Sequence, residues 1–509
     1  MSEQPIKTSE EPKRKQTAKK WIMFVIRWGI AVAGIGWVLS NISLYNQVLI
    51  ANPATGRPLS IRVVGAANES DAQFQVIGPS GATMTVPRSD LLVKSDRDQV
   101  SVRGDDGQQS RVEVLALKVA EPLPREKWPL LVARPRTLWM KYVGGNWGDT
   151  PQLVDPSRVV GDYSVRVPYP IIETGLGPMT ADAFNSHPLY LILAVVVMPI
   201  TFVITSIRWH WLLRLLDIHV PLGRVYVINM VGAFYNTFMP GSTGGDLLKA
   251  YYAAKQTPHR TRAVMSVIID RILGLLALVI LGGTMAAVQY FSATHHDEAT
   301  RKCGQVALGS LLIVLAAAGG AAVFYLRKPL RLDRLIARLP MQRQVVKATD
   351  AMEVYRRHPL VILSAIVMTL PVHGTVVLSA MFAGLAFGLR MHPAYYWVAV
   401  PVIVLAGSIP ISPQGAGVME FFAILLTRSQ GVTVSQAFAL TMSIRVVQIL
   451  WNLTGGIFVL RGGYHAPSEK EQEEMQTDGA EEGGKGGGDT GTGGQGDKGT
   501  RGTAQREAV

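Results

Sequence analysis

Long apolar stretches alternate with polar ones along the chain and predict a protein that crosses a membrane several times. A membrane-spanning helix needs about 20 mostly apolar residues. Runs of this length, several of them close to basic segments, predict helices over residues 21–40, 188–216, 263–291, 305–326, 359–387 and 437–460.

A different pattern occupies residues 50–187. Short stretches such as SIRVVG and AQFQVIG alternate apolar and polar positions and are separated by Gly, Pro, Asn and Asp. This alternation is typical of strands and hairpins. We expect a β-rich inserted domain here. If helix 21–40 runs outward, the domain is extracytoplasmic, where an envelope component is a possible partner.

Two apolar segments are interrupted by Pro and Gly and are too broken to be simple spans. The first, FYNTFMPGSTGGDLLKAYY, lies between basic flanks at Arg224 and Lys255, so both of its ends are expected on the cytoplasmic side. The second, SIPISPQGAGVMEFFAILL, lies within residues 394–428 and is expected to enter from the opposite side. The fold class predicted is an all-α polytopic membrane protein with two inverted re-entrant helical hairpins, plus the extracytoplasmic β-rich domain.

Each broken segment contains an acidic residue that is followed, 25 positions later, by an arginine in an apolar run. The pairs are Asp246 with Arg271 and Glu420 with Arg445. Charges within the membrane are costly and mark a function or a buried partner. Two interpretations stay open for both arginines: an ion pair with the acid of the same half, or direct contact with an anionic headgroup. For Arg271, a side chain extending to the interface is a third.

Small and polar residues surround these charges. Gly244 and Gly245 after Pro240 and Gly241, and Gly415 and Gly417 after Pro413, are expected to permit turns with positive φ and close backbone approach. Asp246 and Glu420 would then lie at the positive ends of new helices. Further polar groups expected at the same level, either in the site or in hydrogen bonds between helices, are Asn236, Asp270, Ser412, Gln414, Gln448 and Asn452.

Composition narrows the function classes. The chain is 48% hydrophobic with a net charge of +13, but its basic residues lie beside the apolar blocks, which favours membrane topology over nucleic-acid binding. Cys303 is the only cysteine, which excludes an intramolecular disulfide and a multi-cysteine zinc site. No metal, cofactor or enzyme motif is predicted. The basic N-terminus (1–20) and the Gly-rich tail (462–509), expected to be disordered, are both predicted to be cytoplasmic.

The motifs NTFMPGSTGGDLLKAYY…SVIIDRILGL and SIPISPQGAGVMEF…SIRVVQILWNLTGG resemble the lysylphosphatidylglycerol synthase transmembrane-region family of flippase-like proteins. The resemblance covers residues 189–461. It implies an inner-membrane protein that moves anionic or modified phospholipids between leaflets. The aminoacyltransferase domain of full-length synthases has no counterpart after residue 461, so synthesis of the lipid is not expected.

Three functions therefore compete. The first is a lipid translocase whose headgroup site contains Arg271, Arg445, Asp246, Glu420, Asn236 and the four glycines Gly244, Gly245, Gly415 and Gly417. The second is a proton-coupled transporter of small anions that uses Asp246 or Glu420. The third is an envelope scaffold that acts through the β-rich domain.

Overall fold

The computed structural model describes most of the chain between residues 32 and 464. The described ranges are 32–52, 54–65, 71–93, 99–104, 107–114, 116–119, 140–143, 153–154, 172–238, 244–258, 260–293, 298–326, 357–389, 391–409 and 412–464, with residues 25, 29, 67, 158, 160, 354 and 355. The predicted N-terminus, nearly all of the predicted tail, Pro240 and Gly241 lie outside these residues.

Strands occupy the N-terminal third, as the alternating pattern predicted. One sheet is ordered β10-β9-β8-β5-β1-β2-β3-β4, with β11 beside β1, and β6 and β7 form a separate pair. All the pairings are antiparallel. The strands are β1 (Gln47–Ala51), β2 (Pro58–Val63), β3 (Gln73–Ile77), β4 (Thr83–Pro87), β5 (Leu91–Val93), β6 (Gln99–Arg103), β7 (Gln109–Glu113), β8 (Ala116–Val119), β9 (Met140–Val143), β10 (Leu153–Val154) and β11 (Ile172–Glu173), with a 3-10 turn η1 (Arg88–Asp90).

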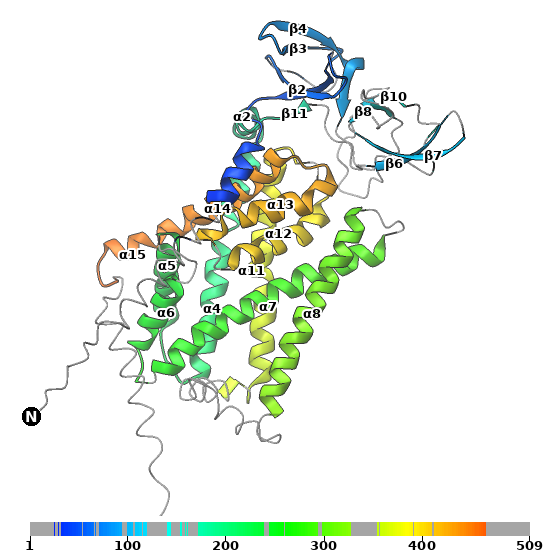
Figure 1. The fold of residues 1–509 in the computed structure, drawn as a ribbon. Helices are drawn as coiled ribbons and strands as arrows, with labels where there is room; N and C mark the ends of the chain where they lie inside the picture. The colour runs from blue at the N-terminus through cyan, green and yellow to red at the C-terminus, as the bar shows by residue number, and fades with distance from the viewer. Residues whose placement is uncertain are drawn as a thin grey trace, which may run out of the picture.

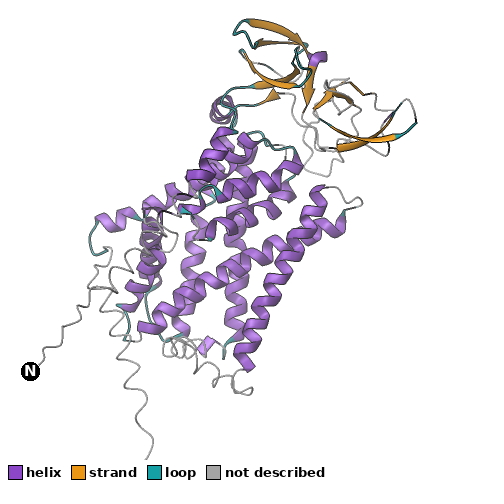
Figure 2. Cartoon of the chain, viewed as in Figure 1, coloured by secondary structure: helices purple, strands orange, loops and turns teal. Residues whose placement is uncertain are grey.

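The strands and helices form separate regions, with the strands beyond one end of the helical part (Figures 1 and 2). The chain enters and leaves the sheet through adjacent segments, because Leu176 N donates to Ser43 O over 2.8 Å and Gly175 N donates to Asn46 Oδ1 over 3.1 Å. After β11 the chain is helical, since α2 (Leu176–Ser186) occupies the end of the segment predicted to be β-rich.

Within the described ranges, five helices are long and apolar enough to cross a membrane: Pro188–Leu215, Arg260–Ser292, Thr300–Ala322, Pro359–Ala386 and Val434–Leu460. They correspond to α3 (Pro188–Val196) with α4 (Pro199–Leu215), α7 (Arg260–Ser292), α8 (Glu298–Leu326), α11 (Pro359–Ala386), and α14 (Val434–Thr454) with α15 (Gly456–Leu460). Residues 32–40 are also helical and belong to the predicted first span. These helices make the chain a multi-pass membrane protein.

The two broken segments form pairs of shorter helices. The first pair is α5 (Leu222–Phe238) and α6 (Gly244–Ala254); the second is α12 (Pro393–Ser408) and α13 (Val418–Thr427), joined through the 3-10 turn η3 (Pro413–Gly415) and followed by η4 (Arg428–Gln430). The second helices have 11 and 10 residues, which corresponds to about 16 Å at 1.5 Å per residue. That length is about half of a bilayer core.

The two pairs pack crosswise on the arginine-bearing helices. Helix α6 contacts α7 and α13 contacts α14, while α12 also contacts α7 and α5 also contacts α14. Each of α7 and α14 therefore packs against one helix from each pair. Two apolar cores support this arrangement, one around Trp209 and Tyr251 and the other around Tyr395 and Tyr396, and all four of these side chains are fully buried.

Candidate functional site

The first ion pair joins α6 to α7. Arg271 Nη1 donates to Asp246 Oδ2, and Arg271 Nη2 lies 3.5 Å from the carbonyl oxygen of Ser408 at the end of α12. Arg271 therefore contacts both short helix pairs. Its side chain is 31% exposed and that of Asp246 is 22% exposed, so the pair is partly accessible.

The second ion pair joins α13 to α14 and is more deeply buried. Arg445 Nη2 lies 2.9 Å from Glu420 Oε1, with side-chain exposures of 11% and 0%. Among the residues that the structure describes, no donor is aligned for a hydrogen bond to Glu420 Oε1, so this is a charge contact rather than a directed bond. The other oxygen, Glu420 Oε2, accepts from Gly417 N over 2.7 Å. Both ion pairs that the 25-residue spacing allowed are thus present.

The guanidinium of Arg445 is incompletely satisfied. Arg445 Nη1 lies 3.6 Å from Met442 Sδ and Arg445 Nη2 lies 3.8 Å from Met419 Sδ, and both sulfur atoms are weak acceptors. Among the described residues, Arg445 Nε is buried without a hydrogen-bond partner, and so is Ser412 Oγ in the loop before η3. Buried donors without partners are costly, so these groups are candidates for contact with a bound anion.

The two pairs occupy equivalent positions in their halves. Each acid is in the first turn of its short helix, Asp246 in α6 and Glu420 in α13. Each arginine lies 11 positions after the first residue of its long helix, because α7 begins at Arg260 and α14 at Val434. The acids are stabilised by the positive helix ends, as the sequence predicted.

Polar side chains of the second half contact Thr237 of the first half. Gln414 Nε2 donates to Thr237 O over 2.9 Å, and Asn452 Nδ2 donates to Thr237 Oγ1 over 3.1 Å. Thr237 on α5 therefore contacts both the second loop and α14. Asn236 Oδ1 instead accepts from Gly245 N over 2.7 Å and holds α5 against α6. Gln448 is exposed and takes no part.

The glycines allow close approach in both pairs, but not all of them turn the chain. Gly244 and Gly245 lie within α6 and neither has positive φ, so the expected turn conformation is wrong for them. Because Gly245 has no side chain, α6 can pack closely against α5. A Cβ at this position would lie only 1.9 Å from Gly232 O. Gly415 and Gly417 do have positive φ, +69° and +82°.

A third ion pair was not predicted. Arg208 Nε donates to Asp270 Oδ1 over 2.8 Å, and Arg208 Nη1 donates to Thr369 Oγ1 over 2.6 Å. Arg208 is only 4% exposed, so this pair lies inside the helical part of the protein. An arginine within an apolar run was the available signal, since the same signal identified Arg271.

No described group of three or more His, Cys, Asp or Glu side chains is placed to hold a metal ion. In the described part of the chain, the acidic residues Asp246, Asp270 and Glu420 are each paired with an arginine.

The sequence is similar to known membrane proteins and matches one family model. The UPF0104 membrane protein PH1989 of Pyrococcus horikoshii is 24% identical over 295 residues, which is 53% of this chain and 87% of that protein. The UPF0104 membrane protein MJ1595 of Methanocaldococcus jannaschii is 27% identical over 122 residues, which is 24% of this chain and about a third (36%) of that relative's length. The lysylphosphatidylglycerol synthase TM region family matches residues 173–456, more than half of the chain, and includes both ion pairs. The chain therefore belongs to the lysylphosphatidylglycerol synthase TM region family.

Proposed function

We propose that this protein is a lipid translocase that moves an anionic or modified phospholipid, or a lipid-linked headgroup, between membrane leaflets. The observation that carries the proposal is the repeated pair of Asp246–Arg271 and Glu420–Arg445 at equivalent positions of two broken helix pairs. Paired broken helices in matching positions of two halves are typical of transporter binding sites.

The arginines suit a phosphate headgroup. A guanidinium binds phosphate through two parallel hydrogen bonds, and backbone N–H groups at a helix start favour the same charge. In this proposal a headgroup phosphate replaces the carboxylate as the partner of each arginine in turn. The buried donors Arg445 Nε and Ser412 Oγ supply additional hydrogen bonds. The acids hold the arginines in position while no lipid is bound.

The topology belongs to the same proposal. The short helices of each pair would enter the membrane and return, one pair from each side, and the acyl chains would stay in the lipid while the headgroup passes between them. We place the protein in the inner membrane with both termini in the cytoplasm and the sheet outside.

The test is lipid movement in proteoliposomes that contain the full-length protein and fluorescent phospholipids with anionic or neutral headgroups. Wild type should accelerate movement of the anionic lipid between leaflets. The combined variant Arg271→Lys and Arg445→Lys keeps both positive charges for the acids but loses the bidentate fork. It should fold normally and lose most of this acceleration, whereas Arg461→Gln, an exposed control after α15, should not.

Two results would overturn the proposal. The first is a well-folded wild type that moves neither class of lipid. The second is a double lysine variant with undiminished movement, because it would leave the arginine forks with a structural role only. Transport of a small anion coupled to protons, without lipid movement, would assign these residues to anion transport instead.

A further inference from the structure

The acid of the second ion pair depends on a single counter-charge. The side chain of Glu420 is 0% exposed, and its Oε1 lies 2.9 Å from Arg445 Nη2. Its Oε2 accepts from Gly417 N over 2.7 Å, whereas Oε1 accepts no hydrogen bond from any described residue. One neutral N–H donor does not balance a full negative charge inside a protein. The charge of Glu420 is therefore balanced by Arg445.

The elements that pack closest to Glu420 supply no second cation. Glu420 is the only ionisable residue within α13, and Arg445 is the only one within α14. Helix 32–40 and the loop 412–417, both of which border the start of α13, contain no ionisable residue.

The ionisable groups of the neighbouring elements are engaged elsewhere or lie further away. Both ionisable residues of α12 are tyrosines: the hydroxyl of Tyr395 donates to a carbonyl oxygen near the end of α13, and Tyr396 lies against α11. Arg428 is in η4, beyond the opposite end of α13 from Glu420. Arg271 contacts the end of α12 but is paired with Asp246. If Arg445 changes partner, none of these described groups takes its place.

Headgroup binding to Arg445 would create this situation, so the inference rests on the proposed function. The site would then contain one guanidinium, one phosphodiester and one carboxylate, with a net negative charge. A buried carboxylate without a counter-charge is costly, and a proton removes that cost. The first half differs, because the side chain of Asp246 is 22% exposed and water can solvate it.

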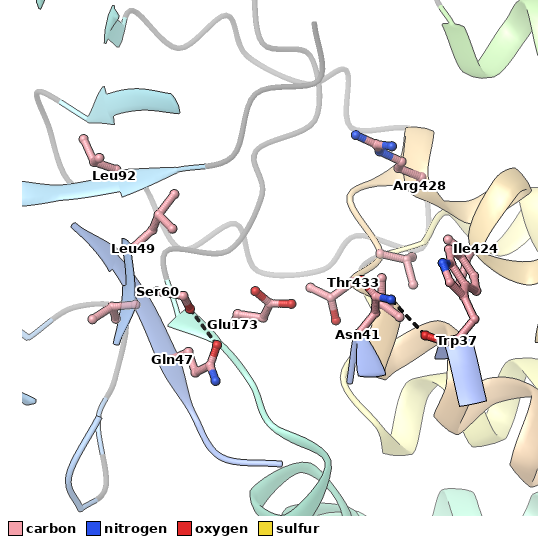
Figure 3. Close-up of a pocket in the computed structure, with 13 residues that line it drawn as sticks. Trp37, Asn41, Gln47, Leu49, Ser60, Leu92, Glu173, Ile424, Arg428 and Thr433 are labelled. Carbon is pink, nitrogen blue, oxygen red and sulfur yellow. Dashed lines mark hydrogen bonds between the residues drawn. The ribbon is translucent and has the colours of Figure 1, made fainter. Parts of the chain in front are cut away.

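A cavity brings polar surroundings close to α13 from the sheet side. Its volume of about 370 Å³ is large enough for several water molecules. Figure 3 shows Gln47 and Ser60 on its sheet side and Asn41 and Ile424 on its helix side. Ile424 follows Glu420 by one helical turn on α13, which is about 6 Å along the helix axis. Water in this cavity would reach to about one helical turn from the buried acid.

We propose that Glu420 takes up a proton when a headgroup occupies Arg445, so that the protein carries one proton with each singly charged lipid. The proton binds Glu420 Oε1, which can then donate a hydrogen bond to the phosphate. It is released when the arginine returns to the carboxylate. The lipid and its proton are neutral together. A pH gradient therefore drives the lipid toward the more alkaline side, whereas the membrane potential leaves its distribution unchanged.

The test is the distribution of fluorescent phosphatidylglycerol between the leaflets of proteoliposomes that contain the full-length protein. A gradient of about one pH unit should enrich the lipid about tenfold in the leaflet on the alkaline side. A potassium diffusion potential of about 60 mV should have no effect, although it would shift an uncompensated lipid charge about tenfold. Protein-free liposomes correct for passive movement. A wild type that moves the lipid but responds to the potential and not to the pH gradient would overturn the proposal.

A variant separates the proton from the lipid. The amide of Glu420→Gln does not take up the proton, so this variant should lose the response to the pH gradient and gain the response to the potential. The matched control is Asp182→Asn, an exposed acid in α2 outside the helices of the ion pairs, which should behave as wild type. A folded Glu420→Gln variant that keeps the pH response would contradict the assignment. Loss of the pH response in Asp246→Asn alone would place the proton site in the first half instead.

A second measurement decides the inference if Glu420→Gln does not fold. Delipidated wild type in weakly buffered detergent should take up about one proton per protein when phosphatidylglycerol is added to saturation, as read with a pH-indicator dye. Phosphatidylcholine, which has no net charge, should cause no uptake. Lipid movement without proton uptake would overturn this inference and leave the proposed translocation standing. Proton uptake without lipid movement would do the reverse.

Discussion

Asp270 and Arg271 are consecutive on α7, yet they form ion pairs with different helices. Asp270 pairs with Arg208 of α4, and Arg271 pairs with Asp246 of α6. Successive helical residues point about 100° apart, so one position along α7 separates the two partners. The Arg208–Asp270 pair is nearly inaccessible, with side-chain exposures of 5% and 12%, whereas Arg271–Asp246 is partly open. We therefore assign the first pair to stability and the second to the proposed transport.

This difference predicts unequal costs of neutralising the two acids. Asp270→Asn should destabilise the protein by about 3–5 kcal/mol, because it leaves the buried Arg208 without a counter-charge. Asp246→Asn should cost about 1 kcal/mol or less, since the side chains of Arg271 and Asp246 are 31% and 22% exposed. Unfolding of each variant in detergent by increasing denaturant measures the difference. Equal costs would contradict the separate roles.

Close packing within the first pair predicts a sharp contrast between two glycines of similar chemistry. Gly245→Ala should destabilise the protein strongly, because its Cβ would overlap Gly232 O of α5. Gly223→Ala, where nothing lies within 4 Å, should be neutral or stabilise by up to about 1 kcal/mol, since alanine is the better helix former. Thermal unfolding midpoints of the two variants provide the comparison, and a tolerated Gly245→Ala would place α5 and α6 further apart.

The helix 32–40 is predicted to depend on Gly417. A Cβ on Gly417 would lie 3.0 Å from Gly34 Cα, and the residue has a φ of +82°. Gly417→Ala should therefore combine backbone strain with displacement of this helix. Gly463→Ala has a similar φ of +91° and open space, so it should show the strain alone, about 1 kcal/mol.

Gly34→Ala tests the packing term separately, because its Cβ would lie 2.8 Å from Gly417 Cα. It should lower the unfolding midpoint without any strain at φ. If Gly34→Ala and Gly417→Ala lower the unfolding midpoint no more than Gly463→Ala does, the contact between Gly34 and Gly417 is ruled out.

The unequal exposure of the two ion pairs predicts unequal chemical labelling. In a Cys303→Ala background, a polar maleimide should modify Asp246→Cys at least about tenfold faster than Glu420→Cys, because the side chains they replace are 22% and 0% exposed. Mass spectrometry of timed samples gives the two rates. Similar rates in folded protein would show that both pairs are equally accessible, and labelling after unfolding serves as the reactivity control.

The chain's own pattern determined the parts of the site that depend on local order. Charged residues are unusual in apolar runs, and the same acid–arginine spacing in two broken segments identified Asp246, Arg271, Glu420 and Arg445. Pro and Gly interrupt the same two segments, so the sequence also predicted that each segment forms a helical hairpin rather than one span. The alternating stretches of the N-terminal third predicted strands for the same reason, since side-chain periodicity is a property of neighbouring residues.

What the tertiary structure decided is which residues far apart in the sequence meet. The spacing of 25 residues was compatible with pairing inside each half, but only the packing of α6 on α7 and α13 on α14 brings the charges together. The sequence did not predict the Arg208–Asp270 pair, because the two residues lie 62 positions apart and meet only where α4 packs on α7. The cavity lined by Trp37, Glu173 and Val434 has no sequence signal, because it requires helix 32–40, β11 and the start of α14 to converge. Periodicity acts within one element, whereas burial and ion pairing depend on the neighbours that folding brings to it.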